Sequence, residues 1–292
     1  MSVRNTIQAL QRMIPQYLRR NRICLGDMRQ AIPKHGVRLH YWHGLEQENL
    51  GDYLSAVIVE HMKQANGVDQ RKPADAHLYA VGSILQAGYQ NAVVWGSGFI
   101  DDPMGSGLSR LFHGHHMRRL DIRAVRGPLT AEALRKLGHT VPEIYGDPGM
   151  LMPLVYQPEK TEEKQPYVVV RHYVDPDICE HTLPILTTDY KAFIDGLCGA
   201  ERVISSSLHG IILAEAYGIP AVLYLPKGTA EQLPLFKYKD YYYGTGRMQF
   251  PVASTIQEAL ELEPCSLPDF SRQAEALEAA FPVDLWRGEK EK

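Results

Sequence analysis

One stretch constrains the fold more than any other part of the chain. Residues 202–220 read Arg-Val-Ile-Ser-Ser-Ser-Leu-His-Gly-Ile-Ile-Leu-Ala-Glu-Ala-Tyr-Gly-Ile-Pro. Val203 and Ile204 suit a buried strand, the serines favour a turn or a helix N-cap, and Gly218 with Pro220 ends the helix that follows. The next apolar segment is typical of a further strand. Such a unit places its turn at the carboxyl edge of a parallel sheet, where open α/β folds bind ligands.

His209 and Gly210 open the helix of this unit. The first turn of a helix has free N–H groups and the positive end of the helix dipole, so it suits an anion such as phosphate or carboxylate. A histidine at that point can move a proton near neutral pH. The alternative interpretation of His209 is a histidine that only caps a structural turn.

Length and composition bound the class of protein. The chain has 292 residues, 45% of them hydrophobic and 22% charged, which predicts a globular protein with two ordinary domains or one large α/β unit. The net charge of −3 argues against a general nucleic-acid binder. No apolar run has the length of a membrane span, the N-terminus lacks the apolar core of a signal peptide, and four scattered cysteines show no metal or redox spacing. We therefore expect a cytoplasmic protein.

The N-terminal 43 residues carry an uneven charge, with eight Lys or Arg and the single acid Asp27. Ile7, Leu10, Ile14 and Leu18 recur at helical spacing. A basic amphipathic helix can lie on an anionic membrane surface, which would give peripheral contact at the inner face of the membrane. The alternative is a helix that packs on the protein with a solvated basic face.

The segment Ser206-Ser207-Leu208-His209-Gly210, with the small-residue helix and Gly-Ile-Pro behind it, resembles the signature of the polysaccharide pyruvyl transferases. Those enzymes usually show Ser-Arg-Leu-His-Gly, so Ser207 stands where most members have arginine. The variant is similar to the succinoglycan-type ketalases of the family. The resemblance implies that His209 is catalytic and that the rest of the segment binds the donor.

The segment after the first expected strand, residues 37–42, contains a second match. Asn49, Gly51 and Asp52 stand at a helix start, where glycine lets a ligand approach the backbone and Asp52 could serve as the N-cap. Plain capping is the alternative. The family carries a similar Asn-x-Gly-Asp motif, which implies that these three residues lie at the donor pocket.

Arg126 ends another expected strand and precedes a helix with Pro128 in its first turn and Gly138 at its end. Its planar guanidinium suits a phosphate or carboxylate, and the alternative is a surface ion pair. The family has a similar Val-Arg block whose arginine contacts the donor, so the resemblance implies donor binding by Arg126. The segment around Asp147 and Pro148 matches the family's Asp-Pro block, in which we expect turn formers.

Residues 157–165 are polar and predict a linker. The strand after it, from Tyr167, is continuously apolar, so we expect it to be buried on both faces. Arg171 and His172 follow at its carboxyl end. Ketalase-like members have a similar Pro-His-Tyr-x-Asp segment, and we expect both residues to bind the donor, with Arg171 supplying the charge that Ser207 does not.

Two further groups are candidates for acceptor binding. His113, His115 and His116 lack carboxylate or cysteine partners at ligand spacing, which favours a polar loop over a metal site and allows sugar contact by His113 or His115. Tyr241 lies in an aromatic, lightly basic stretch; tyrosines pack on sugar faces but also fill space. We expect no metal site.

These observations predict an α/β protein of two Rossmann-like domains facing a cleft, and the resemblance implies a GT-B-like arrangement. The expected parts are a basic helical extension (1–36), an N-terminal domain (37–157), a C-terminal domain with the donor site (166–265) and a C-terminal helical segment (266–292) anchored by Trp286.

The function that the resemblance implies is transfer of pyruvate from phosphoenolpyruvate to a pair of sugar hydroxyls, with a cyclic ketal and phosphate as products. The acceptor would be a surface polysaccharide or its lipid-linked precursor, no cofactor is expected, and nucleic acid is not an expected partner. The alternatives are a glycosyltransferase of the same architecture that uses a nucleotide sugar, and a carbohydrate-binding protein without activity.

Overall fold

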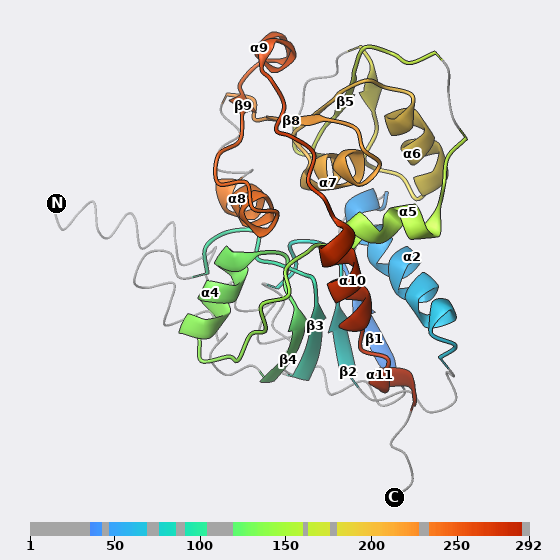
Figure 1. The fold of residues 1–292 in the computed structure, drawn as a ribbon, viewed down its shortest axis with the longest axis vertical. Helices are drawn as coiled ribbons and strands as arrows, with labels where there is room; N and C mark the ends of the chain where they lie inside the picture. The colour runs from blue at the N-terminus through green and yellow to red at the C-terminus, as the bar shows by residue number, and fades with distance from the viewer. Residues whose placement is uncertain are drawn as a thin grey trace, which may run out of the picture.

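The computed structural model describes residues 36–42, 47–68, 76–85, 91–103, 119–159, 163–175, 180–227 and 234–287. Within them the chain forms two separate sheets in which every strand pairing is parallel. The first sheet lies in the lower half of Figure 1 and the second in the upper half. This arrangement confirms the α/β class.

The first sheet has the order β1-β2-β3-β4. Its strands are β1 (Val37–His40), β2 (Ala76–Tyr79), β3 (Asn91–Trp95) and β4 (Arg119–Ala124). Two of the helices that follow these strands are α2 (Leu50–Ala65) after β1 and α4 (Pro128–Lys136) after β4. All four residues of β2 are buried, as a strand between two neighbours with covered faces requires.

The second sheet has the order β6-β5-β7-β8-β9. Its strands are β5 (Val168–Val170), β6 (Thr182–Leu183), β7 (Val203–Ser205), β8 (Ala221–Tyr224) and β9 (Val252–Ala253). Its helices are α6 (Tyr190–Cys198), α7 (Leu208–Ala216), α8 (Leu235–Gly244) and α9 (Ile256–Glu261). The three central strands are fully buried, and α7 is buried along nearly its whole length.

Several short elements join the two halves. The 3₁₀ turn η2 (Pro148–Leu151) and α5 (Met152–Val155) lie on the way from the first sheet to the second, and η2 packs against both α2 and α7. After β9 and α9 the chain returns to the first sheet through α10 (Ser271–Ala279) and α11 (Asp284–Arg287) (Figure 1). There α10 contacts β3 through Trp95, and α11 contacts β4 through Arg123.

The C-terminal return is fastened by aromatic side chains. The indole N–H of Trp95 donates to the carbonyl of Leu277 at 2.8 Å, and the Phe281 ring packs between Trp95 and Trp286, with centroid distances of 5.0 and 5.5 Å. Trp286 is only 6% exposed, so it is the expected anchor. Burying these rings contributes several kcal/mol, because a fully buried large apolar side chain is worth about 1.5–3 kcal/mol.

The structure confirms most of the expected strands and helices and corrects one cap. Asn49, not Asp52, is the N-cap of α2, and Asp52 lies inside the first turn. The aromatic stretch around Tyr241 forms α8, a helix that the sequence pattern did not predict. The expected N-terminal helix, His113 and His115 fall outside the described residues.

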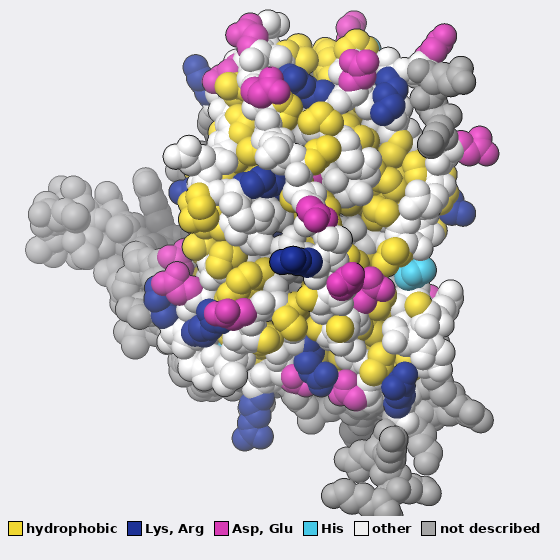
Figure 2. Space-filling model, in the orientation of Figure 1, with side chains coloured by type: hydrophobic (Ala, Val, Ile, Leu, Met, Phe, Trp, Pro, Cys, Tyr) yellow, Lys and Arg dark blue, Asp and Glu magenta, His cyan; other side chains and the backbone are white. Residues whose placement is uncertain are grey.

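Two features concern the surface and membrane contact. No helix in the described part of the chain combines the length and apolar character that a membrane crossing needs. On the face drawn in Figure 2, basic and acidic side chains are interspersed among apolar ones, so this face carries no broad patch of one charge.

Candidate functional site

The candidate site is built from segments that follow the carboxyl ends of seven strands. In the first sheet these are the segments after β1, β2, β3 and β4, and in the second the segments after β5, β7 and β8. Parallel strands bring such segments to one edge of each sheet. They meet around the N-terminus of α7, where His209 is the second helical residue.

The serine turn before α7 is held by its own side chains. The Ser205 hydroxyl accepts from the Ser207 N–H at 3.0 Å and lies 2.8 Å from the carbonyl of Val170, to which it donates. Ser207 is the N-cap by position, but its side chain makes no capping bond. A Cβ on Gly210 would lie 2.4 Å from the Ser205 oxygen. Glycine is therefore required here for the helix to start this close to the strand.

The imidazole of His209 lies against the first turn of α2. A Cβ on Gly51 would lie 2.0 Å from Nδ1 of His209, and the added atom would overlap the ring. The Asp52 carboxylate and the Cε1 atom of His209 both lie within 4 Å of the point where a Cβ on Gly82 would stand. Two glycines thus leave room for the imidazole between the halves of the molecule.

Gly51→Ala is expected to displace the His209 imidazole by about 1 Å or more, because the added Cβ would overlap the ring. A displacement of that size costs about 100-fold in turnover when the side chain takes part in a reaction. Gly199→Ala is the control: its φ of −75° suits alanine, and its Cβ would meet only backbone oxygens of α6, the nearest at 3.3 Å, and not the His209 ring. Steady-state kinetics of both variants make the comparison. Wild-type turnover in Gly51→Ala would contradict the placement of His209.

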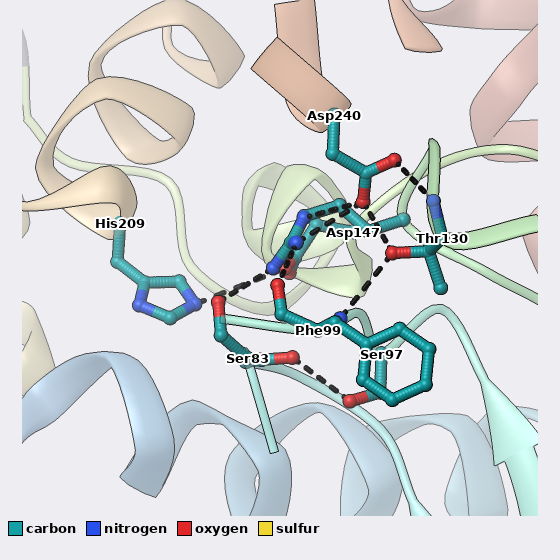
Figure 3. A network of polar contacts seen from close by, with 9 residues as sticks. Ser83, Ser97, Phe99, Thr130, Asp147, His209 and Asp240 are labelled. Carbon is teal, nitrogen blue, oxygen red and sulfur yellow. Dashed lines mark hydrogen bonds and ion pairs between the residues drawn. The ribbon is translucent and has the colours of Figure 1, made fainter. Parts of the chain in front are cut away.

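Asp147 faces His209 just beyond hydrogen-bond distance. Its Oδ1 accepts from the Gly149 N–H at 2.9 Å and so caps η2, while Oδ2 lies 3.8 Å from Nε2 of His209. Both of these facing atoms are buried, and neither has a hydrogen-bond partner among the residues that the structure describes. Figure 3 shows the two side chains pointing toward one another. Buried polar atoms are normally satisfied, so a pair left open marks a place for a polar ligand group.

Burial shifts the pKa of both side chains toward their neutral forms. Desolvation, with smaller effects from the charges of Lys237 and Arg126, lowers the pKa of His209 to about 3. Desolvation likewise raises the pKa of Asp147 to about 6, against the opposing effect of its bond from Gly149. At neutral pH, His209 is therefore a neutral imidazole and Asp147 a carboxylate.

Arg126 is fully enclosed and is held by the protein itself. Its Nε donates to Oδ2 of Asp240 at 3.1 Å, Nη1 donates to the Ser83 hydroxyl at 2.6 Å, and Nη2 donates to the carbonyl of Phe99 at 2.5 Å. Asp240 also accepts from the N–H and hydroxyl of Thr130, which ties α8 to the start of α4 (Figure 3). The charge of Arg126 is thus balanced by an internal carboxylate.

Lys237 on α8 brings a second cation to the site. It is 4% exposed, and within the described residues its ammonium group makes no hydrogen bond or ion pair, although it lies 4.9 Å from the centroid of the Tyr238 ring. Desolvation first, and then the charge of Arg126, lower the pKa of Lys237 to about 7, while Asp52 acts in the opposite direction. A buried cation without an ion partner is poised to accept an anion.

The segment after β5 lies on the other side of His209. Arg171 forms a buried ion pair with Asp175, whose Oδ2 also accepts from the Ser206 hydroxyl at 3.1 Å. The Ser206 hydroxyl in turn accepts from the His172 N–H at 2.9 Å. Desolvation, then the charges of Lys237 and His209, lower the pKa of His172 to about 3. Arg171 follows β5 at the carboxyl edge of the second sheet, as expected from the sequence, but the carboxylate of Asp175 already balances its charge.

The structure brings together a subset of the residues expected at the site. Gly51 lies against the ring of His209, and Asp52 lies near the same ring. The charge of Arg126 affects the pKa of His209, and the charge of His209 affects the pKa of His172. Asp52 affects the pKa of Lys237 in the same way. Other expected residues have structural surroundings. These are Asn49 as the N-cap of α2, Leu208 in the core, and Tyr241, whose hydroxyl donates to Glu215.

Two residues of the site were not singled out from the sequence. Asp147 was expected only to form a turn, and its second oxygen is the part that faces His209. Lys237 stood in a stretch with no strand or helix signal. In the described ranges, no three His, Cys, Asp or Glu side chains lie together in a way that would hold a metal ion.

Comparison with known proteins adds three findings. A family model described as polysaccharide pyruvyl transferase matches residues 6–227. The "Uncharacterized protein L143" of Acanthamoeba polyphaga mimivirus is 26% identical over 238 residues, which cover 75% of this chain and 79% of that protein. A solved structure of a functionally uncharacterised protein from Klebsiella pneumoniae aligns with a TM-score of 0.44 at 13% identity, covering 79% of this chain and 93% of that one.

Proposed function

The chain belongs to the polysaccharide pyruvyl transferase family, and we propose that it transfers the pyruvyl group of phosphoenolpyruvate to two hydroxyls of one saccharide. The products would be a cyclic ketal and inorganic phosphate. One observation carries the proposal. The buried Nε2 of His209 lies at a helix N-terminus and makes no hydrogen bond among the described residues, and the ammonium group of Lys237, whose charge acts on the pKa of His209, has no ion partner in the same part of the chain. This combination offers both a proton carrier and a site for an anion.

The proposed reaction begins at the methylene carbon of the donor. His209, protonated once the donor is bound, gives a proton to that carbon, which leaves a cationic centre at C2. One sugar hydroxyl adds to C2 and loses its proton, and phosphate then leaves with the C–O bonding electrons. The second hydroxyl closes the ring on C2 and loses its proton. The neutral His209 formed in the first step, or the Asp147 carboxylate, is available to accept these protons.

Donor binding would supply the proton affinity that the empty site lacks. A unit charge 4 Å from the imidazole contributes about 4 kcal/mol at an effective dielectric constant of about 20, which corresponds to about three pKa units. Phosphoenolpyruvate carries a phosphate and a carboxylate. Its charge is therefore large enough to move the pKa of His209 from about 3 into the neutral range.

The anion contacts are assigned from the charges that the protein leaves unbalanced at the site. Arg126 and Arg171 already pair with Asp240 and Asp175, which favours another cation in the role of the arginine that most family members have at the position of Ser207. We assign that charge to Lys237 instead. The free N–H groups at the start of α7 add the positive end of a helix dipole.

Lys237→Met is expected to weaken donor binding and to change its pH dependence. Lys237 attracts the anion only as an ammonium ion, and the bound anion raises its pKa above the value of about 7 in the free protein. The dissociation constant for phosphoenolpyruvate therefore rises more steeply with pH above about 7, by up to tenfold per pH unit, and the variant loses this increment. Titrations from pH 6.5 to 9 measure it.

The exposed Lys191→Met is the control for that titration, because its ammonium lies over the Tyr156 ring away from the site. Folding should not suffer in Lys237→Met, since the variant no longer has to bury a charge. Equal pH profiles for the wild type and Lys237→Met would remove Lys237 from the donor site.

The architecture supports the GT-B-like arrangement that we propose for residues 37–157 and 166–265. Each range contributes a parallel sheet, and side chains after strands of both sheets surround His209. We further propose a saccharide of a surface polysaccharide, or its lipid-linked precursor, as the acceptor. No additional cofactor is needed for the chemistry above.

The test of the proposed function is release of phosphate from phosphoenolpyruvate in the presence of a panel of saccharides, with the product identified by mass spectrometry. A product heavier than the saccharide by the pyruvyl ketal, formed in equal amount with phosphate, is expected. Turnover of a nucleotide sugar instead would show a glycosyltransferase and overturn the proposal.

A further inference from the structure

Trp42 and Tyr173 form an exposed aromatic pair next to the candidate site. Their rings are stacked, with centroids 5.4 Å apart and planes inclined by 19°. They are 37% and 39% exposed, and no other aromatic side chain belongs to the large hydrophobic groups exposed in the described residues. Exposed aromatic surface is costly in water, and a cluster of it commonly marks a binding site.

The pair spans the two halves of the molecule. Trp42 follows β1 of the first sheet, and Tyr173 follows β5 of the second. Both therefore stand at the carboxyl edges where the site is built. The contact joins two segments that are far apart in the sequence, so its position depends on how the two sheets are arranged.

A third ring connects the pair to the reacting groups. The His172 ring lies 4.5 Å from the Tyr173 ring, so Trp42, Tyr173 and His172 form a continuous row from the surface inward. The charges of Lys237 and His209 act on the pKa of His172, and burial and the charge of Asp52 raise the pKa of Tyr173. The inner end of the row thus reaches the residues proposed to bind and protonate the donor.

We propose that Trp42 and Tyr173 are a stacking platform for the acceptor saccharide. A sugar ring has an apolar face of C–H groups and a rim of hydroxyls, and the electron-rich face of an aromatic ring packs on the first while leaving the second free. An acceptor lying along this row would rest its outer rings on the pair. Its terminal hydroxyl pair would then point toward His209. The inference rests on the proposed function in that the reaction is taken to be pyruvyl transfer. The binding of a sugar to the pair does not depend on that reaction.

The three tryptophans make a direct binding assay possible. Trp95 is fully buried and Trp286 is 6% exposed, so acrylamide should quench the fluorescence of Trp42 selectively. The probes are methyl glycosides of glucose, galactose, mannose and N-acetylglucosamine, titrated without phosphoenolpyruvate. At least one is expected to lower the quenching constant about twofold, and Trp42→Phe should lose this signal. No protection of Trp42 by any of the four at 100 mM would overturn the platform.

Kinetics separate the platform from the reaction. With an accepted saccharide, Trp42→Ala and Tyr173→Ala are each expected to raise the KM for that saccharide about tenfold, the factor that corresponds to loss of one aromatic contact, with donor affinity unchanged. Leu154→Ala, which removes a 50% exposed apolar side chain elsewhere, is the control. Unchanged KM in both aromatic variants would overturn the platform and leave the reaction standing. If a sugar protected Trp42 but no pyruvyl transfer occurred, the platform would stand and the proposed reaction would be overturned.

Discussion

Replacing His209 by glutamine is expected to lower kcat about 1,000-fold while the protein stays folded. A positioned general acid or base contributes about 10²–10⁴ to rate, and in the proposed reaction His209 is the group that protonates the donor carbon. Glutamine keeps most of the volume of the side chain, so the packing against Gly51 is preserved. Initial rates of phosphate release measure the effect.

His61→Gln is the matched control, because His61 lies farther along α2 and is not part of the site. Its kcat is expected to equal that of the wild type. Binding of phosphoenolpyruvate to His209→Gln should stay within about tenfold of the wild type, since the anion is held by Lys237 and backbone N–H groups. A kcat within threefold of the wild type in His209→Gln would show that His209 carries no proton in the slow step.

Asp240→Asn is expected to destabilise the protein by about 3–5 kcal/mol. Asp240 and Arg126 are both fully buried and lie 3.0 Å apart, and Asp240 also caps α4 through Thr130. Removing the carboxylate charge leaves the guanidinium buried without compensation, which is the costly way to break an internal ion pair. Urea unfolding of the two proteins at pH 7 measures the difference in unfolding free energy.

The exposed pair of Arg123 and Asp284 supplies the control for that experiment. Its shortest N–O distance is 2.9 Å, similar to that of the buried pair, but both side chains reach solvent. Asp284→Asn is therefore expected to change the unfolding free energy by less than about 1 kcal/mol. If Asp240→Asn were no more damaging than Asp284→Asn, the internal pairing of Arg126 would not stabilise the fold.

Strands and helices with strong local signals were predictable from the sequence. The Gly-x-Pro stop after α7 is one example: Gly218 has φ of +74°, which favours glycine at this helix end. Pro128 at the start of α4 is another. In contrast, α8 was not predicted, because its tyrosines have only moderate helix propensity and three of them are buried by contacts with distant segments.

The sequence predicted the location of the site better than its chemistry. The sequence indicated that Arg126 and His209 each follow the carboxyl end of a strand, but the partner of Arg126 lies 114 residues away on α8. Only the fold shows that this pairing leaves Lys237 as the cation without an ion partner in the described part of the site. Likewise, the local sequence predicted the turn at Asp147, whereas the direction of the second carboxylate oxygen depends on how η2 packs against α7.

The most direct measurement is isothermal titration of the full chain with phosphoenolpyruvate at pH 7.5 in buffers of different ionisation enthalpy. The account predicts binding with a net uptake of protons, because the bound anion raises the pKa of His209 from about 3 and that of Lys237 from about 7. His209→Gln should lose its share of that uptake. Absence of binding, binding without proton uptake, or binding of a nucleotide sugar in place of phosphoenolpyruvate would contradict it.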